Sequence, residues 1–401
     1  MTSAVALAAA GALALTGCGS SGGGSKKSGG LGGGGGSSSS AAGGGGATSG
    51  KTYKIGFQGA LSGDNKQLGI NEVNAFNLAI QQANSSGKYN FKIAGEPSDD
   101  GGTNNQAPAA AAKLIQDASV LGVVGPAFSG PTTATGAKYA QASMALISPS
   151  ATNETLTKSG YTTFHRIVPT DGVEGLATAD YLAKKFKTVF VVDDKSTYGA
   201  GVGDVVRAEL KKKGVKVSSQ GIAPTSDYSA IAQTVKSSGD QAMYYAGYDA
   251  QAGLLAKALK AVSYTGFEIS GNGGKSSIFT STAGSAGNGY YFACGCLDAV
   301  TAPAAAAFTK AYQAKYNTPP STYSPEAYDA TNALITAIAT AAKSGTPTRQ
   351  SVESAVNGLN YQGITTTVKF QKSGEVAQAT VNLYEQKNGK IDLLGDITQQ
   401  K

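Results

Sequence analysis

The chain has 401 residues, more than one ordinary hydrophobic core can organise, so we expect about two lobes. Charged residues make up 15% of it, and the net charge of +7 is spread along the chain without a stripe of basic and aromatic residues, which argues against nucleic-acid binding. The single histidine, His165, lies in a predicted strand, and no Cys/His spacing suggests zinc, so we expect no metal and no other cofactor.

The first residues, Met1–Leu15, are almost entirely Ala, Leu, Val and Gly, and they are too few to span a bilayer. They end in Leu15-Thr16-Gly17-Cys18, which resembles the bacterial lipobox. The resemblance implies that residues 1–18 are a lipoprotein signal and that Cys18 is acylated as the new N-terminus. The alternative is an ordinary secretion signal in which Cys18 is incidental. No Lys or Arg precedes the apolar run, which leaves the true start codon open.

Residues 19–51 are nearly all Gly, Ser and Ala, a composition typical of a flexible coil. A coil of this length has an end-to-end distance of about 30 Å. We therefore expect a tether that holds a folded body away from a membrane.

The folded body begins with alternating strand and helix patterns, which predict a parallel sheet with right-handed crossovers. The predicted elements are strand Tyr53–Gln58, helix Ile70–Ala83, strand Phe91–Ala94 and helix Pro108–Asp117.

The stretch Leu121–Thr152 then carries two short apolar runs, Val120–Val124 and Met144–Ile147, each followed by small hydroxyl residues. The pattern predicts a strand, a helix from the turn Pro126–Thr133, and a second strand. Turns of this kind let a ligand approach the backbone, and exposed N–H groups at a helix start favour an anion. Because parallel strands present such turns at one edge of the sheet, we expect a site for a small ligand with a negatively charged end.

A second series of the same kind follows Asp171, and it predicts a second α/β lobe. Its elements are helix Val173–Phe186, strand Val189–Val192, helix Val202–Lys213, strand Val215–Ser218, helix Tyr228–Ser237, strand Ala242–Tyr245, helix Gln251–Ala261 and strand Glu268–Ser270. The chain then continues with helices Pro303–Tyr316 and Ala327–Ala342 and strands Val368–Phe370 and Thr380–Glu385.

From Tyr53 onward, the order of these elements and their turns resembles the periplasmic leucine/isoleucine/valine-binding protein family, the solute receptors of ABC importers. The matching pieces are Gly59-Ala60-Leu61-Ser62-Gly63, Asp99-Asp100, Val124-Gly125 with Ser129, Ser148-Pro149-Ser150-Ala151-Thr152, Asp194-Lys195 with Tyr198-Gly199, and Tyr244-Tyr245-Ala246-Gly247-Tyr248. The resemblance implies an α/β fold of two doubly wound parallel-sheet lobes joined by a three-strand hinge, the type I periplasmic binding fold. The expected lobes are residues 52–171 with 297–375, and residues 172–296 with 376–401.

The resemblance also implies a set of ligand-binding residues. Ser129, Ser150 and Thr152 of the first lobe would receive a carboxylate, as the turns themselves suggest. Tyr198 and Tyr248 of the second lobe would close over an apolar side chain. Each of these residues could instead cap a helix or pack in the core.

Two positions depart from the family pattern. Leu68 stands where the family often has an aromatic residue, which leaves the shape of the apolar wall open. Asn272 stands where amino-acid receptors of the family have a glutamate for the ligand's ammonium, and an amide lacks that charge. Either Asp249 or Glu326 replaces the missing carboxylate, or the ligand is an aromatic or branched acid without an ammonium group.

Cys294 and Cys296 are the remaining cysteines. The family's first-lobe disulfide is absent, because its positions are Gly102 and Phe128 here. The Cys-x-Cys pair, which aligns close to a crossover between the lobes, forms either a small disulfide or two buried thiols.

These observations predict an extracytoplasmic, lipid-anchored, monomeric solute-binding protein that captures a branched-chain or other apolar amino acid for an ABC permease by hinge closure. A ligand sensor for a signalling receptor is the competing class. We do not expect an enzyme, because only His165 could be the histidine of a catalytic triad and it lies away from a predicted turn.

Overall fold

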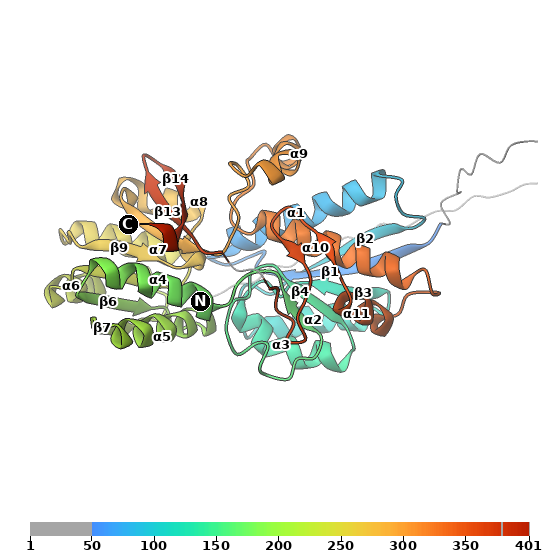
Figure 1. The fold of residues 1–401 in the computed structure, drawn as a ribbon, viewed down its shortest axis with the longest axis horizontal. Coiled ribbons are helices and arrows are strands. Elements are labelled where there is room, and N and C mark those ends of the chain that lie inside the picture. The colour runs from blue at the N-terminus through green and yellow to red at the C-terminus, as the bar shows by residue number, and fades with distance from the viewer. Residues whose placement is uncertain (1–49, 378–379, 401) are drawn as a thin grey trace, which may run out of the picture. The chain divides into compact units, whose positions relative to one another are not determined.

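Two β-sheets organise the part of the chain that the computed structural model describes, residues 50–377 and 380–400 (Figure 1). The predicted signal, the acylated Cys18 and nearly all of the predicted tether lie outside these residues. We call the elements around the five-stranded sheet the first lobe and those around the seven-stranded sheet the second lobe.

The first sheet is entirely parallel and has the order β2-β1-β3-β4-β5. Its strands β3 and β4 are buried along their whole length, which explains why their sequences are continuous apolar runs rather than alternating ones. The strands are β1 (Thr52–Gly59), β2 (Lys92–Asp99), β3 (Val120–Val124), β4 (Ala145–Ser148) and β5 (Phe164–Arg166), and the helices between them are α1 (Lys66–Ser85), α2 (Ala107–Gln116) and α3 (Ser129–Gln141).

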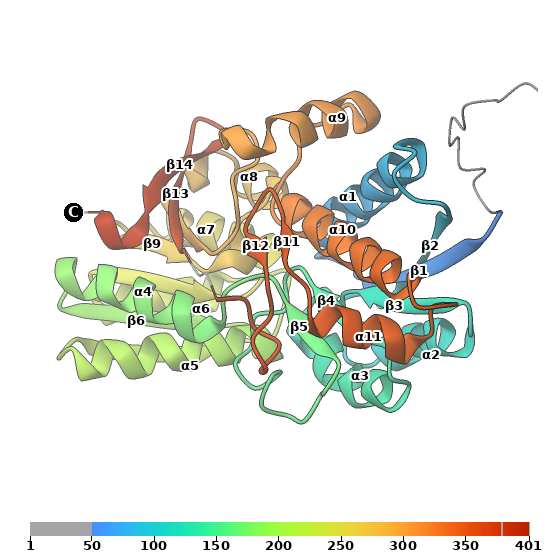
Figure 2. The same ribbon diagram turned by 45° about the vertical axis from the view of Figure 1, so that its right-hand side comes forward.

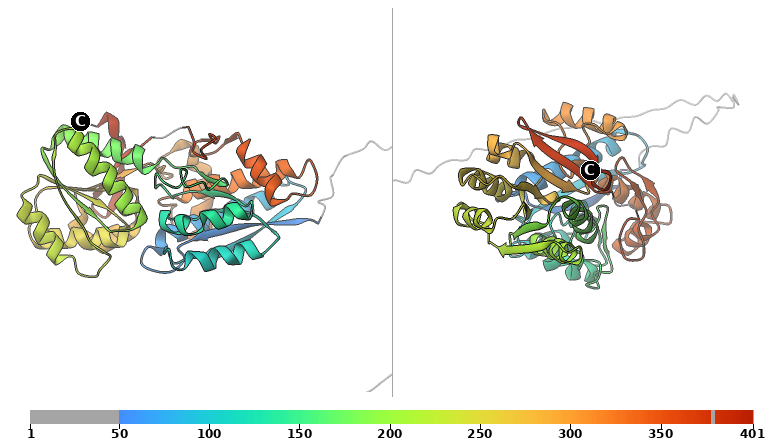
Figure 3. Two further views of the ribbon diagram at one scale, coloured as in Figure 1. Left: turned by 90° about the horizontal axis from the view of Figure 1, so that it is seen from below. Right: turned by 60° about the vertical axis from the view of Figure 1, so that its left-hand side comes forward.

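Late segments of the chain return to this first lobe. Helices α10 (Ser324–Ala341) and α11 (Arg349–Asn357) share one apolar core with β1, β3 and β4. Figure 2 shows α10 beside α1, and Figure 3 shows orange segments within the blue and teal lobe. Helix α9 (Ala306–Tyr316), preceded by a 3₁₀ turn at Pro303–Ala305, and the short pair β11 (Tyr361–Gln362) and β12 (Thr367–Val368) complete this part of the chain.

The second sheet has the order β14-β13-β10-β9-β8-β6-β7. Its five sequentially earlier strands are parallel, and β13 and β14 form an antiparallel hairpin at one edge. The strands are β6 (Thr188–Asp193), β7 (Lys216–Gly221), β8 (Ala242–Ala246), β9 (Phe267–Ser270), β10 (Tyr290–Cys294), β13 (Asn382–Lys387) and β14 (Lys390–Asp396), and the helices are α4 (Asp171–Lys185), α5 (Thr197–Lys212), α6 (Ser229–Ser238), α7 (Asp249–Ala261) and α8 (Ser277–Ala283).

The expected fold of two α/β parallel-sheet lobes is confirmed, and the second sheet carries an antiparallel hairpin at one edge in addition. The sequence analysis missed β10 and β14. Strand β14 is largely exposed, so its sequence lacks the apolar run that marks a buried strand. The chain passes between the two sheets three times, after β5, after β10 and before β13, and the residues at which the lobes divide remain a prediction.

Candidate ligand-binding site

Two turns at the ends of β3 and β4 place hydroxyl groups where the lobes meet. Ser129 is the first residue of α3, and its buried Oγ accepts a hydrogen bond from the Asn153 amide at 3.2 Å. The Asn153 side chain donates to the Thr197 carbonyl of the second lobe at 2.8 Å, so this turn touches both lobes. The buried Thr152 hydroxyl makes no hydrogen bond with the described residues. It lies beside the Asp171 carboxyl, whose pKa it lowers, so these two side chains are neighbours where the lobes meet.

Ser150 lies in the same turn, but its hydroxyl is already used. Its Oγ is 2.6 Å from Glu72 Oε1 and 2.6 Å from the Ala127 carbonyl. Burial raises the pKa of Glu72 to about 8, so this carboxyl is protonated at neutral pH. The Ser150 hydroxyl has two acceptors within reach, the Glu72 carboxyl and the Ala127 carbonyl. Ser150 thus supports the turn from within the first lobe rather than presenting a free donor.

The two predicted tyrosines come together on the second lobe. Tyr198, in the first turn of α5, and Tyr248, just before α7, are 5.3 Å apart between ring centroids. The Tyr198 hydroxyl accepts a hydrogen bond from the Gly273 amide at 3.1 Å. Across the lobe boundary, Phe128 stacks on Tyr248 at 4.7 Å. Leu68 belongs to the same apolar cluster, so the aromatic group of the first-lobe wall is supplied by Phe128 instead of position 68.

Asn272 does have a carboxylate beside it, one that the sequence analysis did not consider. Glu174 of α4 accepts hydrogen bonds from the Asn272 amide at 3.0 Å and from Asn272 Nδ2 at 2.8 Å, and a longer one from the Gly295 amide at 3.4 Å. Both side chains are buried. Burial raises the pKa of Glu174 to about 7. Gly271 makes this approach possible, because a Cβ there would lie 2.7 Å from Glu174 Oε1.

Asp171, the first residue of α4, supplies a second carboxylate one helical turn before Glu174. It is 1% exposed, and neither of its carboxylate oxygens makes a hydrogen bond with the described residues. Burial raises its pKa to about 8, against a smaller opposing effect of the nearby Thr152 hydroxyl. A buried carboxylate without a donor is costly, so this group is suited to a cationic partner.

A third tyrosine, Tyr323, adjoins these carboxyls. It lies directly before α10 with φ = 68°, in the left-handed region that bulky residues rarely adopt. The charges of Glu174 and Asp171 contribute to its raised pKa, together with those of Glu326 and Glu72, although burial is the larger cause. Such strain is tolerated when the surrounding structure holds it, and it is frequent at ligand sites. No local sequence signal marks this residue.

The two carboxylates considered as replacements have other contacts. Asp249 accepts hydrogen bonds from the Ser276 hydroxyl and from the Ala250 amide at the start of α7. Glu326 accepts one from the Leu297 amide at 2.7 Å, and its second oxygen has no partner among the described residues. Burial raises the pKa of Asp249 to about 6 and that of Glu326 to about 7.

Of the remaining candidates, His165 lies away from these contacts, whereas the two cysteines flank Gly295, whose amide donates to Glu174. His165 is buried in the first lobe, with its ring nitrogens 3.2 Å from the Leu146 carbonyl and from Asn357 Oδ1. Cys294 and Cys296 are joined by a disulfide at the end of β10. Within residues 50–377 and 380–400, no group of three or more His, Cys, Asp or Glu side chains could hold a metal, and no helix is long and apolar enough to cross a membrane.

We call the residues gathered here the interlobe site; they are Leu68, Phe128, Ser129, Thr152, Asp171, Glu174, Tyr198, Tyr248, Asn272 and Tyr323. It combines hydroxyl groups at a helix start, an apolar aromatic wall and two buried carboxyls.

Comparisons with known proteins agree with this architecture. The family described as periplasmic binding protein matches residues 52–390. The Leu/Ile/Val-binding protein BraC3 of Rhizobium johnstonii is 29% identical over 343 residues, 84% of this chain and 92% of that protein. A leucine-, isoleucine-, valine-, threonine- and alanine-binding protein of Pseudomonas aeruginosa is 28% identical over 346 residues, 83% of this chain and 90% of that protein.

A solved structure shows the same fold. It is the branched-chain amino acid transporter substrate-binding protein LivJ of Streptococcus pneumoniae in complex with isoleucine, with a TM-score of 0.77, 27% identity, and coverage of 86% of this chain and 100% of that one. The family consists of extracytoplasmic solute-binding proteins, not enzymes. With its two α/β lobes and its match over residues 52–390, this chain belongs to the periplasmic binding protein family, in its type I, leucine/isoleucine/valine-binding branch.

Proposed function

We propose that this protein captures a branched-chain or other apolar amino acid between its lobes and delivers it to an ABC permease. The observation that carries the proposal is the pair of buried carboxyls, Asp171 and Glu174, beside a set of hydroxyl and N–H groups. These groups are complementary to the two charged ends of an amino acid.

The carboxylate end of the ligand is assigned to the first lobe. Thr152 places a buried hydroxyl at this turn, and Ser129 stands at the start of α3, where backbone N–H groups favour an anion. Hydrogen bonds to a charged group contribute about 1.5–3 kcal/mol each, so two of them orient a small ligand.

The ammonium end is assigned to the carboxyls of α4. Asp171 has two unpartnered oxygens, and Glu174 already holds Asn272 in place. An ammonium would pair with charge that burial otherwise disfavours. Glu174, rather than Asp249 or Glu326, thus serves the purpose of the glutamate expected at position 272.

The apolar body of the ligand fits the wall of Leu68, Phe128 and Tyr248. The Rhizobium and Streptococcus relatives are named for Leu/Ile/Val and for branched-chain amino acids, which agrees with an aliphatic side chain at this wall. The lipid anchor at Cys18, the tether and a monomeric state complete the proposal.

A thermal-shift panel tests the ligand class. Each apolar amino acid is paired with its deaminated analogue, for example leucine with 4-methylpentanoate. Ligand at a hundred times its dissociation constant should stabilise the protein by about 2.7 kcal/mol. We expect a shift with leucine or another apolar amino acid and none with the matching acid.

A Tyr198→Ala variant is the control, because it should weaken the shift through the interlobe site. A shift with the deaminated acid alone would favour a carboxylic acid without an ammonium group. No shift with any member of either class would contradict both ligand assignments.

A further inference from the structure

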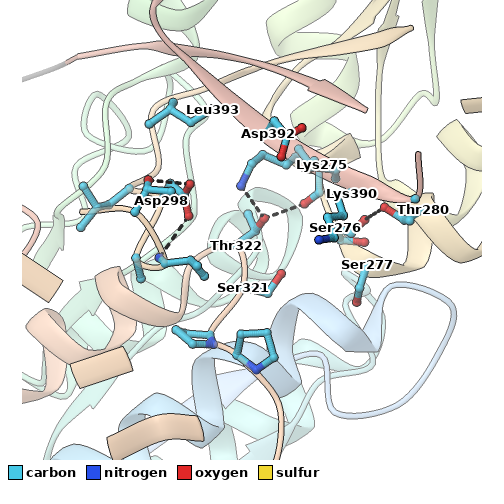
Figure 4. Close-up of a pocket in the computed structure, with 18 of the residues that line it drawn as sticks. Lys275, Ser276, Ser277, Thr280, Asp298, Ser321, Thr322, Lys390, Asp392 and Leu393 are labelled. Carbon is cyan, nitrogen blue, oxygen red and sulfur yellow. Dashed lines mark hydrogen bonds between the residues drawn. The ribbon is translucent and has the colours of Figure 1, made fainter. Parts of the chain in front are cut away.

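A second pocket lies on the described surface, outside the interlobe site. It has a volume of about 680 Å³, within the usual range of small-molecule sites. Segments of both lobes line it (Figure 4). The second lobe contributes residues around the start of α8 and the β13–β14 turn. The other side is formed by the loops before α9 and α10, the helices that return to the first lobe. We call it the outer pocket; the lining residues used below are Lys275, Leu297, Asp298, Val300, Thr322 and Leu393.

The outer pocket contains a buried cation. Lys275 is 8% exposed, and its side chain reaches across the pocket to Thr322, where Nζ donates to Oγ1 at 3.3 Å (Figure 4). Its Nζ also lies 4.2 Å from the centroid of the Tyr384 ring. Neither neighbour carries a negative charge, and within the described residues no carboxylate lies within 4.0 Å of the Lys275 ammonium.

The nearby carboxylate of Asp298 is engaged in its own turn. Its Oδ1 accepts a hydrogen bond from the Val300 amide at 3.1 Å, and its Oδ2 accepts one from the Thr301 hydroxyl at 2.8 Å. Burial lowers the pKa of Lys275 to about 8, although Asp298 and Glu326 oppose that shift. The Lys275 ammonium is thus desolvated without a close counter-ion, which is costly unless an anion binds.

The rim of the pocket is open and combines apolar side chains with the charged side chains of Lys390 and Asp392 at the start of β14. Val300 is 59% exposed and Leu393 is 37% exposed, and both line it together with Leu297. Exposed apolar groups around a single buried cation favour a ligand with one negative charge and an apolar body.

The outer pocket shares two chain segments with the interlobe site. Lys275 follows Asn272 by three residues, and Thr322 directly precedes Tyr323. The Thr322 hydroxyl also donates to the Lys275 carbonyl at 2.8 Å, so the floor of the pocket is a direct contact between the segment before α8 and the segment before α10.

We propose that the outer pocket is a second ligand site, for a small monocarboxylate with an apolar body. The carboxylate of this ligand binds Lys275 Nζ. The pocket exists only while the segment before α8 and the segment before α10 are in contact. A ligand there stabilises the arrangement in which the lobes meet. A ligand in the outer pocket therefore raises the affinity of the interlobe site for its amino acid. By reciprocity, the amino acid raises the affinity of the outer pocket for its ligand by the same factor.

Equilibrium dialysis of the full chain with radiolabelled phenylacetate tests the site. The chain carries Tyr198→Ala, so that any binding of the probe at the interlobe site is weakened. We expect saturable binding of one phenylacetate per chain. Lys275→Met keeps the length of the side chain but removes its charge, and should weaken binding about ten- to hundredfold.

Lys387→Met is the matched control, an exposed lysine at the end of β13 that does not line the pocket, and it should leave binding unchanged. Val300→Asp places a negative charge on the exposed rim, where it cannot disturb folding, and should weaken binding about two- to fivefold. No saturable binding to the parent chain, or equal binding by the Lys275→Met and Lys387→Met variants, would overturn the proposal.

The coupling is tested on the chain with Tyr198 intact, and this step alone rests on the proposed function. Saturating phenylacetate should lower the dissociation constant of leucine in the parent but not in the Lys275→Met variant. An unchanged constant in the parent would refute the coupling. A failure of leucine to bind at all would refute the proposed function, and the dialysis result would still decide the outer pocket.

Discussion

Asp171 and Glu174 are unusual residues to find buried side by side at the start of one helix. Acidic side chains in the first turn are favourable electrostatically, since they face the positive end of the helix dipole. Their burial nonetheless raises the pKa of both, to about 8 and about 7. The ammonium group of the proposed ligand would offset the free energy lost in desolvating them.

The Glu174→Gln variant should separate the two ligand classes. It keeps the size of the side chain but removes the charge that would pair with an ammonium. We expect the affinity for the amino acid to fall about ten- to hundredfold, as measured by calorimetric titration. Asp204→Asn, on an exposed part of α5, should have no effect. Equal loss in both variants would show that Glu174 has no specific role.

The pH dependence follows from the same raised pKa values. In the ligand-free fold these carboxyls keep their protons to about pH 7–8, whereas in the unfolded chain they release them near pH 4. Their contribution to stability is therefore present at low pH and is lost as pH rises through the folded pKa. Glu72 and Glu326 shift in the same direction.

An ammonium ligand pairs with the ionised carboxylates, so its thermal shift should grow between pH 6 and pH 8. The deaminated acid should show the opposite trend, because its own charge is repelled. The measurement is a thermal-shift series across this range, with Asp171→Asn as the variant in which the slope should decrease. A leucine shift that falls with rising pH would contradict the role of these groups.

At the scale of elements, Arg166 connects two crossovers to the turn that carries Thr152. It ends β5 and is fully buried. Its guanidinium donates to both oxygens of Glu375, at 2.9 and 2.6 Å, and its Nη1 donates to the carbonyls of Ala151 and Asn153 at 3.0 and 2.8 Å. Arg166 is thus a positioning residue for the turn.

Replacing Arg166 by Met should destabilise the protein by about 3 kcal/mol, because it leaves Glu375 and two buried carbonyls without their donor. Urea unfolding measures this loss, and the affinity for leucine should fall as well. Lys158→Met, which removes an exposed i,i+4 ion pair with Glu154, should change neither quantity. An Arg166→Met variant as stable as the parent would show that the network is dispensable.

At the scale of the whole molecule, the proposed function requires that the two lobes move relative to each other. The described lobes touch through polar contacts such as Asn153 with Thr197, and through the stacking of Phe128 on Tyr248. Such a boundary is suited to opening and closing about the three crossovers. Residues 1–51, including Cys18, would keep this body near the membrane that holds its permease.

The anchor is tested by Cys18→Ala. Two acyl chains suffice for stable membrane attachment, so the parent should sediment with membranes and the variant should be released or remain unprocessed. Fractionation and intact mass of the exported protein measure both properties. A variant that is processed and fractionates as the parent does would show that Cys18 is not lipidated.

The sequence by itself determined the local elements and the class of the protein. Buried strands appear as apolar runs, such as Val120–Val124, and the small hydroxyl residues after them mark turns that can bind an anion. Those signals depend on neighbouring residues, so they can be recognised without the fold. They also placed Ser129, Thr152, Tyr198 and Tyr248 at turns of the two lobes.

Only the tertiary structure decided which charged groups meet. Glu174 and Asn272 are 98 positions apart, and nothing near either one indicates the other. The same holds for the stacking of Phe128 on Tyr248, for the engaged hydroxyl of Ser150 and for the burial of Lys275. Burial and pairing at such positions depend on how distant segments pack, and that packing, rather than any local pattern, sets the pKa of each carboxyl and the polarity of each site.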